Sequence, residues 1–175
     1  MRTTKKLTLS AILVALGAII MALGAMFEVV DLTVCAIASL IVVFIYLEIG
    51  SPYTWLVWLS TSLVTFIIFP AKTVWLNYLL IFGVYPLLKA YIEKLPRLFW
   101  IIVKLVYINA VIWIMFFLMD IIFGYPLFEK DAPLWLRIVL YVIMNVAFIA
   151  YDLFITVSVK IYYGKIRQKI ARMLK

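Results

Sequence analysis

Polar and aromatic side chains gather in one short stretch of this otherwise strongly apolar chain. Lys72, Trp75, Asn77 and Tyr78 lie within nine residues of Pro70. Aromatic rings beside an amide and a single cation suit a small, flat, partly polar ligand. We therefore take these four residues as candidate substrate contacts. A belt of aromatic residues at the membrane interface would explain the same pattern without a ligand.

A second group of polar residues interrupts the apolar runs nearer the C-terminus. Asn109 and Asp120 are spaced to share a helix face, and so are Asn145 and Asp152. A polar group in hydrocarbon is costly and calls for a partner or a water-filled pocket. We predict two pairs across neighbouring helices: Asn109 with Asn145, and Lys104 with Asp152.

These pairs allow two interpretations, which the sequence leaves open. They could be hydrogen-bonded structural pairs, or they could belong to a relay for a proton or a substrate. The hypothesis of a ligand pocket in the outer half of the helices adds Asn109 and Asp120 to the candidate substrate-binding residues Lys72, Trp75, Asn77 and Tyr78.

The residues that enzymes and metal sites need are scarce. The chain has no histidine, and Cys35 is its only cysteine, so an internal disulfide is impossible. It contains neither the GxxxxGK[ST] signature of a nucleotide-binding loop nor the GxSxG signature of a serine hydrolase. We therefore expect no catalytic residues, no metal site and no cofactor.

The composition identifies the setting in which these residues must work. The chain has 175 residues, of which 69% are hydrophobic and 14% are charged. Average soluble chains are about half apolar and about a quarter charged. Since one crossing takes about 20 apolar residues, the sequence predicts an all-α integral membrane protein. It forms a single domain over 1–175, with six transmembrane helices at 8–27, 31–48, 52–69, 73–92, 98–124 and 134–163.

The distribution of basic residues predicts the orientation. With the N-terminus in the cytoplasm, 13 of the 16 basic residues lie on the cytoplasmic side, all except Lys72, Lys130 and Arg137. Both termini are then cytoplasmic. The basic, amphipathic tail from about residue 160 is suited to anchoring on anionic lipid heads, with docking of a partner as the other interpretation.

The first helix carries an unusual number of small residues. Ala11, Ala15, Ala18, Ala22 and Ala25 are spaced to form one stripe along it. Small residues let two helices approach closely in a membrane. Packing inside the protein accounts for the last three alanines. Ala11 and Ala15 follow a basic segment at the predicted cytoplasmic edge, so we take them as candidate partner-docking residues.

The opening "KKLTLSAILVAL", with Ala11 and Ala15 forming an AxxxA motif, resembles the substrate-binding S component of energy-coupling factor (ECF) transporters. The resemblance implies that this strip docks on a shared transmembrane coupling subunit driven by two ATPase subunits. It also implies a bacterial plasma-membrane protein that takes up a vitamin or another micronutrient at its outer face. No residue set matches the riboflavin, thiamine, biotin or folate members, so the substrate is left open.

A different class of protein is the alternative. A structural membrane protein that transports nothing, such as a MreD-like scaffold of a cell-shape complex, has a similar size and number of helices. Ligand binding separates the two hypotheses, because a transporter subunit carries a small molecule and a scaffold does not.

Overall fold

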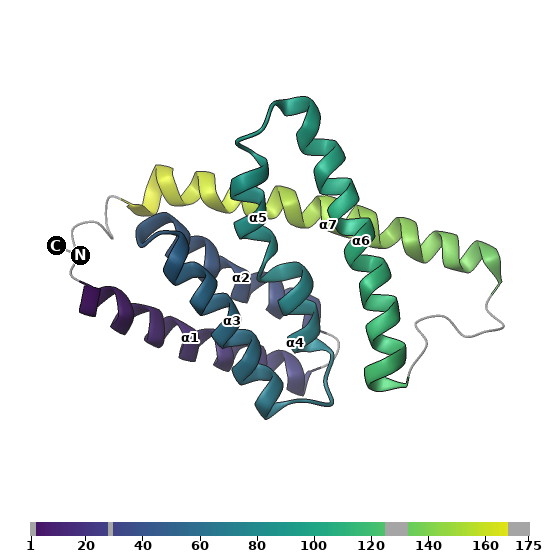
Figure 1. Cartoon of the computed structure of the whole chain (residues 1–175), viewed down its shortest axis with the longest axis horizontal. Coiled ribbons are helices and arrows are strands. Elements are labelled where there is room, and N and C mark those ends of the chain that lie inside the picture. Colours follow the sequence, from purple (N-terminus) through teal and green to yellow (C-terminus); the bar gives the residue numbers. More distant parts are fainter. Residues whose placement is uncertain (1–2, 28–29, 125–132, 168–175) are drawn as a thin grey trace. The chain divides into compact units, whose positions relative to one another are not determined.

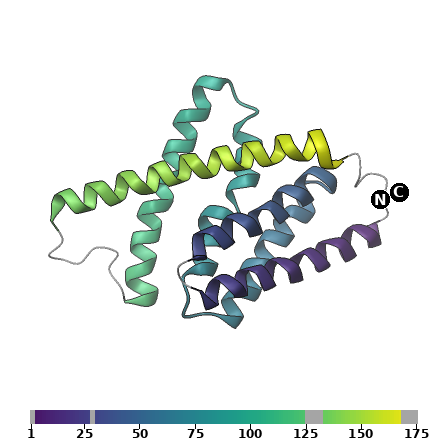
Figure 2. The same cartoon turned by 180° about the vertical axis from the view of Figure 1, so that it is seen from behind.

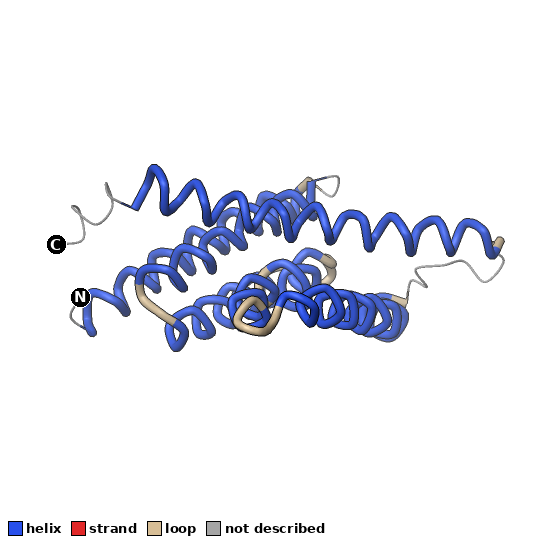
Figure 3. Tube along the Cα trace, turned by 90° about the horizontal axis from the view of Figure 1, so that it is seen from above, coloured by secondary structure: helices blue, strands red, loops and turns tan. Residues whose placement is uncertain are grey.

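The computed structural model describes residues 3–27, 30–124 and 133–167, and within these ranges every regular element is a helix (Figures 1 and 3). Six helical segments are long and apolar enough to cross a membrane. They are Thr3–Met26, Asp31–Glu48, Ser51–Ile68, Val74–Ile92, Phe99–Phe123 and Leu134–Lys165. The prediction of an all-α chain with six such segments is confirmed, whereas the side on which the termini lie stays a prediction. Lys130 and tail residues 168–175 lie outside the described ranges.

The observed helices follow the predicted order closely. They are α1 (Thr3–Met26), α2 (Asp31–Glu48), α3 (Ser51–Ile68), α4 (Val74–Asn77), α5 (Tyr85–Ile92), α6 (Arg97–Phe123) and α7 (Leu134–Ile161). Two π-helical turns, η2 (Tyr78–Phe82) and η3 (Tyr162–Ile166), complete the order. The clearest difference in bounds is that α1 begins at Thr3 rather than residue 8, so its basic start is helical.

The chain divides into two compact units, and we describe each by itself. Unit 1 comprises Met1–Tyr91 and Ile155–Lys175, and unit 2 comprises Ile92–Phe154. Unit 1 therefore contains α1 to α5 and the C-terminal end of α7, whereas unit 2 contains α6 and the remainder of α7.

Unit 1 is a bundle in which α1, α2 and α3 pack against one another, with α4 and η2 against α2 and α3 (Figures 1 and 2). Its core includes a cluster formed by Ile41, Ile45 and Ile49 of the α2 segment and Val57 of α3. Gly50 separates the two helices at φ 105°, a conformation that favours glycine. Gly50 thus forms the turn between α2 and α3, and the packing of the isoleucine and valine side chains stabilises the hairpin.

Two glycines bring α1 close to its neighbours inside the bundle, and Ala25 at the end of the alanine stripe is buried as predicted. A Cβ atom at Gly17 would lie 3.1 Å from Thr61 Cγ2, and one at Gly24 would lie 3.0 Å from Val34 Cγ1. Ser10 lies seven residues before Gly17 and is also buried. Residues seven apart lie near one face of a helix. The inner face of α1 therefore carries Ser10, Gly17 and Gly24.

The fourth of the six long apolar segments is interrupted just before Pro86, which has no backbone N–H to donate. The Gly83 N–H bonds to the Tyr78 carbonyl at 2.7 Å and closes the π turn, and α5 then begins at Tyr85. A Cβ atom at Gly83 would lie 2.6 Å from Trp58 Cδ1 and 2.8 Å from a ring carbon of Tyr78. The Trp58 and Tyr78 rings therefore pack directly against the backbone of Gly83, which has no side chain.

Several segment ends meet at one end of unit 1. The Lys6 ammonium lies 5.8 Å from the centre of the Tyr53 ring, which joins the start of α1 to the start of α3. The Tyr162 hydroxyl donates to Glu48 at 2.8 Å, which joins η3 to the end of α2. The first and last described segments of the chain therefore lie at the same end of this unit.

Gly83→Ala should destabilise the protein, because the added methyl group has no space between Trp58 and Tyr78. Overpacking of this kind costs about 1–3 kcal/mol. Gly164→Ala is the matched control, since nothing lies within 4 Å of a Cβ there. Thermal unfolding in detergent measures both variants. We expect a lower midpoint for Gly83→Ala alone, and equal midpoints for the two variants would contradict the packing described.

Candidate functional site

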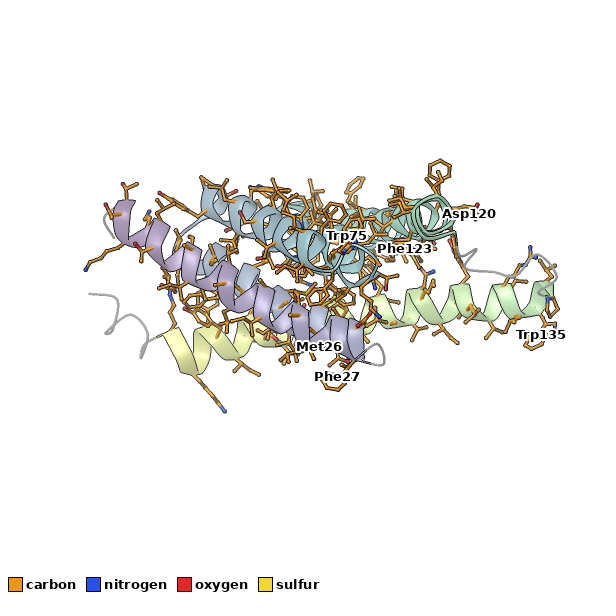
Figure 4. All side chains as sticks on the ribbon, turned by 90° about the horizontal axis from the view of Figure 1, so that it is seen from below. Met26, Phe27, Trp75, Asp120, Phe123 and Trp135 are labelled. Atoms are coloured by element: carbon orange, nitrogen blue, oxygen red, sulfur yellow. The ribbon has the colours of Figure 1, made fainter. Side chains whose placement is uncertain are left out.

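The two candidate docking residues lie on the outer face of α1. Ala11 and Ala15 are exposed, and Ala25 at the far end of the same stripe is buried. Leu7 and Ile12 beside them are each 60% exposed. Figure 4 shows α1 running from this region to Met26 and Phe27. The small residues at positions 11 and 15 are therefore not needed for packing within unit 1.

The four candidate substrate residues of unit 1 lie around α4, at the opposite end of α1 from Ala11. Val74 contacts the position of Gly24, near the C-terminal end of α1. Asn77 and Lys72 are half-buried. Lys72 and Asn77 can thus be reached from outside the unit, on the far side from the docking pair.

Trp75 and Tyr78 are packing residues of unit 1. The Trp75 ring lies edge-on to Phe66, with 4.8 Å between ring centres, and its Nε1 donates to the Pro70 carbonyl at 3.3 Å. Figure 4 labels Trp75 among the side chains of the bundle. Tyr78 is 1% exposed and faces the side chains of Thr61 and Cys35. Both rings are thus used for packing inside the bundle, and their role as substrate contacts stays a prediction.

Three hydroxyl groups of α3 bond back to the backbone four residues earlier, as expected for such residues in apolar surroundings. Thr54 donates to the Gly50 carbonyl at 2.9 Å, Ser62 to the Trp58 carbonyl at 2.9 Å and Thr65 to the Thr61 carbonyl at 2.8 Å. Thr61 differs, because its buried Oγ1 does not bond back to its own helix and faces the Tyr78 side chain instead. It lies against Gly17 on α1.

The predicted pair of Lys104 and Asp152 is confirmed in unit 2. Lys104 Nζ lies 2.9 Å from Asp152 Oδ1 and 3.0 Å from Oδ2. It also lies 3.1 Å from Glu93 Oε1, so all three ammonium protons have an acceptor. The Lys104 and Asp152 side chains are 14% and 19% exposed. A largely buried, fully bonded ammonium group is suited to fixing α6 against α7.

The predicted pair of Asn109 and Asn145 is wrong. The Tyr141 hydroxyl donates to Asn109 Oδ1, and Asn109 Nδ2 donates to the Leu105 carbonyl at 2.7 Å. Asn145 Nδ2 donates to the Tyr141 carbonyl of its own helix at 3.0 Å. The tyrosine takes the place of the second asparagine because its hydroxyl lies at the end of a much longer side chain.

Asp120 is exposed near the C-terminal end of α6 (Figure 4). It and Asn109 belong to unit 2, whereas Lys72, Trp75, Asn77 and Tyr78 belong to unit 1. The six candidate substrate residues thus form two separate sets. Among the described residues, no group of three His, Cys, Asp or Glu side chains could hold a metal ion.

The sequence interpretation missed the cluster around Glu48. This carboxylate accepts the Tyr162 hydroxyl and lies 3.6 Å from Arg167 Nε. It also missed that Lys89 is only 4% exposed. The available signal was the carboxylate itself, because an acid in the last turn of a helix opposes the helix dipole and calls for compensation.

Lys104→Met should destabilise the protein by about 3 kcal/mol, because it leaves two carboxylates without their shared cation in a largely buried place. The double variant Lys104→Met/Asp152→Leu should recover most of that loss, since it removes the stranded charge as well. Chemical denaturation of the two single variants and the double variant gives the coupling. Additive losses in this cycle would show that the ion pair does not hold α6 to α7.

We compared the chain with protein-family models, with curated proteins and with solved structures, and none of them matches it.

Proposed function

We propose that this chain is the membrane-embedded, substrate-binding subunit of an ECF-type importer in a bacterial plasma membrane. In this proposal it takes up a vitamin or another micronutrient at the outer face, with both termini in the cytoplasm. It docks through α1 on a shared coupling subunit driven by two ATPase subunits. The chain itself performs no catalysis. Six membrane-crossing segments and the AxxxA motif in α1 support the proposal.

The exposure of Ala11 and Ala15 carries the proposal. The inner face of α1 already uses Ser10, Gly17 and Gly24 for its contacts inside the bundle. Nothing in unit 1 therefore requires small residues at 11 and 15, where leucine would suit a face in contact only with lipid. In a membrane, a flat strip permits the backbone approach on which helix association depends. A partner helix is the occupant that gains from it.

Substrate contact is assigned to the opposite end of unit 1. The half-buried Lys72 and Asn77 supply a cation and an amide there, and the buried Trp75 and Tyr78 pack their segment into the bundle. Asn109 and Asp120 remain candidate contacts from unit 2. Docking and capture are then separate functions that different substitutions can remove.

Ala11→Leu and Ala15→Leu should each abolish co-purification of ATPase subunits from host membranes. Each adds a bulky side chain to a strip that must lie against another helix. Ala147→Leu is the matched control, because it makes the same change at an exposed alanine of α7. Quantitative mass spectrometry of the affinity-purified chain measures the bound subunits. If both α1 variants retain them as fully as the control does, the docking proposal is wrong.

Native mass spectrometry of the chain purified from its own host should show one bound small molecule. Asn77→Leu should lose that mass, since the amide no longer contacts the substrate, and Ala11→Leu should keep it. Asn145→Leu is the control, because the Asn145 amide donates to its own helix. A protein that carries neither a small molecule nor ATPase subunits would instead support the MreD-like scaffold.

A further inference from the structure

Glu48 is the last residue of α2. A carboxylate is electrostatically disfavoured there, because the C-terminal end of a helix carries partial negative charge. The Glu48 side chain is only 13% exposed. Two groups, one from η3 and one from the residue that follows it, compensate the charge of Glu48: the Tyr162 hydroxyl lies 2.8 Å and Arg167 Nε lies 3.6 Å from Oε1. The carboxylate therefore fixes the position of the segment that contains Tyr162 and Arg167.

The π turn η3 is what allows both groups to reach one carboxylate. Residues five apart in a regular α-helix point about 140° away from each other, since each residue advances by about 100°. In η3 the Arg167 N–H bonds to the Tyr162 carbonyl, five residues earlier. This bond places Arg167 one turn beyond Tyr162, on the same side of the segment. The π turn thus brings Tyr162 and Arg167 to the same side of the segment, where both contact Glu48.

The Arg167 guanidinium is held on a second side by an aromatic ring. Its Cζ lies 5.0 Å from the centre of the Tyr163 ring, within the range of a cation–π contact. Arg167 is nevertheless 51% exposed. With Nε turned to Glu48 and one face on Tyr163, the two terminal nitrogens form no hydrogen bond with any residue in the described ranges. The Arg167 guanidinium is thus held in one orientation at the surface, with the N–H donors of its two terminal nitrogens available.

We propose that Arg167 binds the phosphate of an anionic phospholipid headgroup, in an orientation set by Tyr163 and Glu48. The planar fork of arginine matches phosphate oxygens in a two-pronged contact that a lysine cannot make. The location selects a lipid as the source of that phosphate, because η3 forms the C-terminal end of Leu134–Lys165, a segment long and apolar enough to cross a membrane, and Arg167 follows that segment two residues later. Lys160 and Lys165 are exposed beside it and add to the attraction for anionic headgroups.

The proposal differs from general anchoring by a basic tail, which depends only on the number of positive charges. Arg167→Lys keeps the charge but removes the fork and the stacked plane. Glu48→Gln makes the region more positive but removes the group that orients the guanidinium. General anchoring predicts unchanged binding for the first variant and tighter binding for the second, whereas the proposed site predicts weaker binding for both.

The test titrates the full-length protein in detergent with phosphatidylglycerol and, separately, with phosphatidylcholine, and counts retained lipids by native mass spectrometry. The wild type should retain phosphatidylglycerol selectively. Arg167→Lys should lower that affinity about tenfold, the loss of one charge-assisted hydrogen bond. Tyr163→Leu, a change at an exposed residue, should also lower it, and Lys165→Arg should not. Thermal unfolding of each variant confirms that it is folded.

Two results would overturn the proposal. One is wild-type retention of phosphatidylglycerol by both Arg167→Lys and Tyr163→Leu, which would leave only general attraction between charges. The other is complete displacement of phosphatidylglycerol by millimolar inorganic phosphate, which would make the site one for a soluble anion rather than a lipid.

Discussion

Close contact between α1 and the rest of unit 1 depends on two glycines of α1, Gly17 and Gly24, which have no side chain. Helices in a bilayer gain little from burying apolar surface against one another, so they associate where backbones approach closely. Gly17 lies against Thr61 and Gly24 against Val34, and in both places a Cβ atom would be at or near the limit of contact. This constraint fixes which face of α1 turns inward. Ala11 and Ala15 are exposed on the outer face, where we propose that an external partner docks.

In unit 2, hydrogen bonds and ion pairs between polar side chains connect the helices. The Lys104 ammonium bonds to Asp152 and Glu93, and Tyr141 bonds to Asn109. A hydrogen bond or ion pair gains strength in surroundings of low dielectric constant, and a lost partner costs more there for the same reason. Glu48 follows the same principle in unit 1. These groups are few, and each one joins segments that are distant in the sequence.

The sequence predicted features that depend on composition and on regular spacing. The number and order of the spanning helices follow from the length of the apolar runs, and Lys104 and Asp152 were paired correctly from their depths in their helices. The sequence did not predict contacts that depend on side-chain length, or local departures from α-helical geometry. Asn109 is bonded by Tyr141 because the tyrosine side chain is longer, which counting along a helix does not capture. The π turns at Tyr78 and Tyr162 occur together with tertiary contacts to Trp58 and Glu48, which the local sequence did not indicate.

Photo-cross-linking in intact cells tests the central claim about α1 most directly. A photoreactive amino acid at position 11 samples whatever lies against the outer face of the helix, and one at position 147 samples an exposed site on α7. We expect position 11 to form a covalent adduct with another membrane protein, identified by mass spectrometry as a coupling subunit, and position 147 to label mainly lipid. Lipid adducts alone at both positions would contradict the account, because the outer strip of α1 would then have no protein partner.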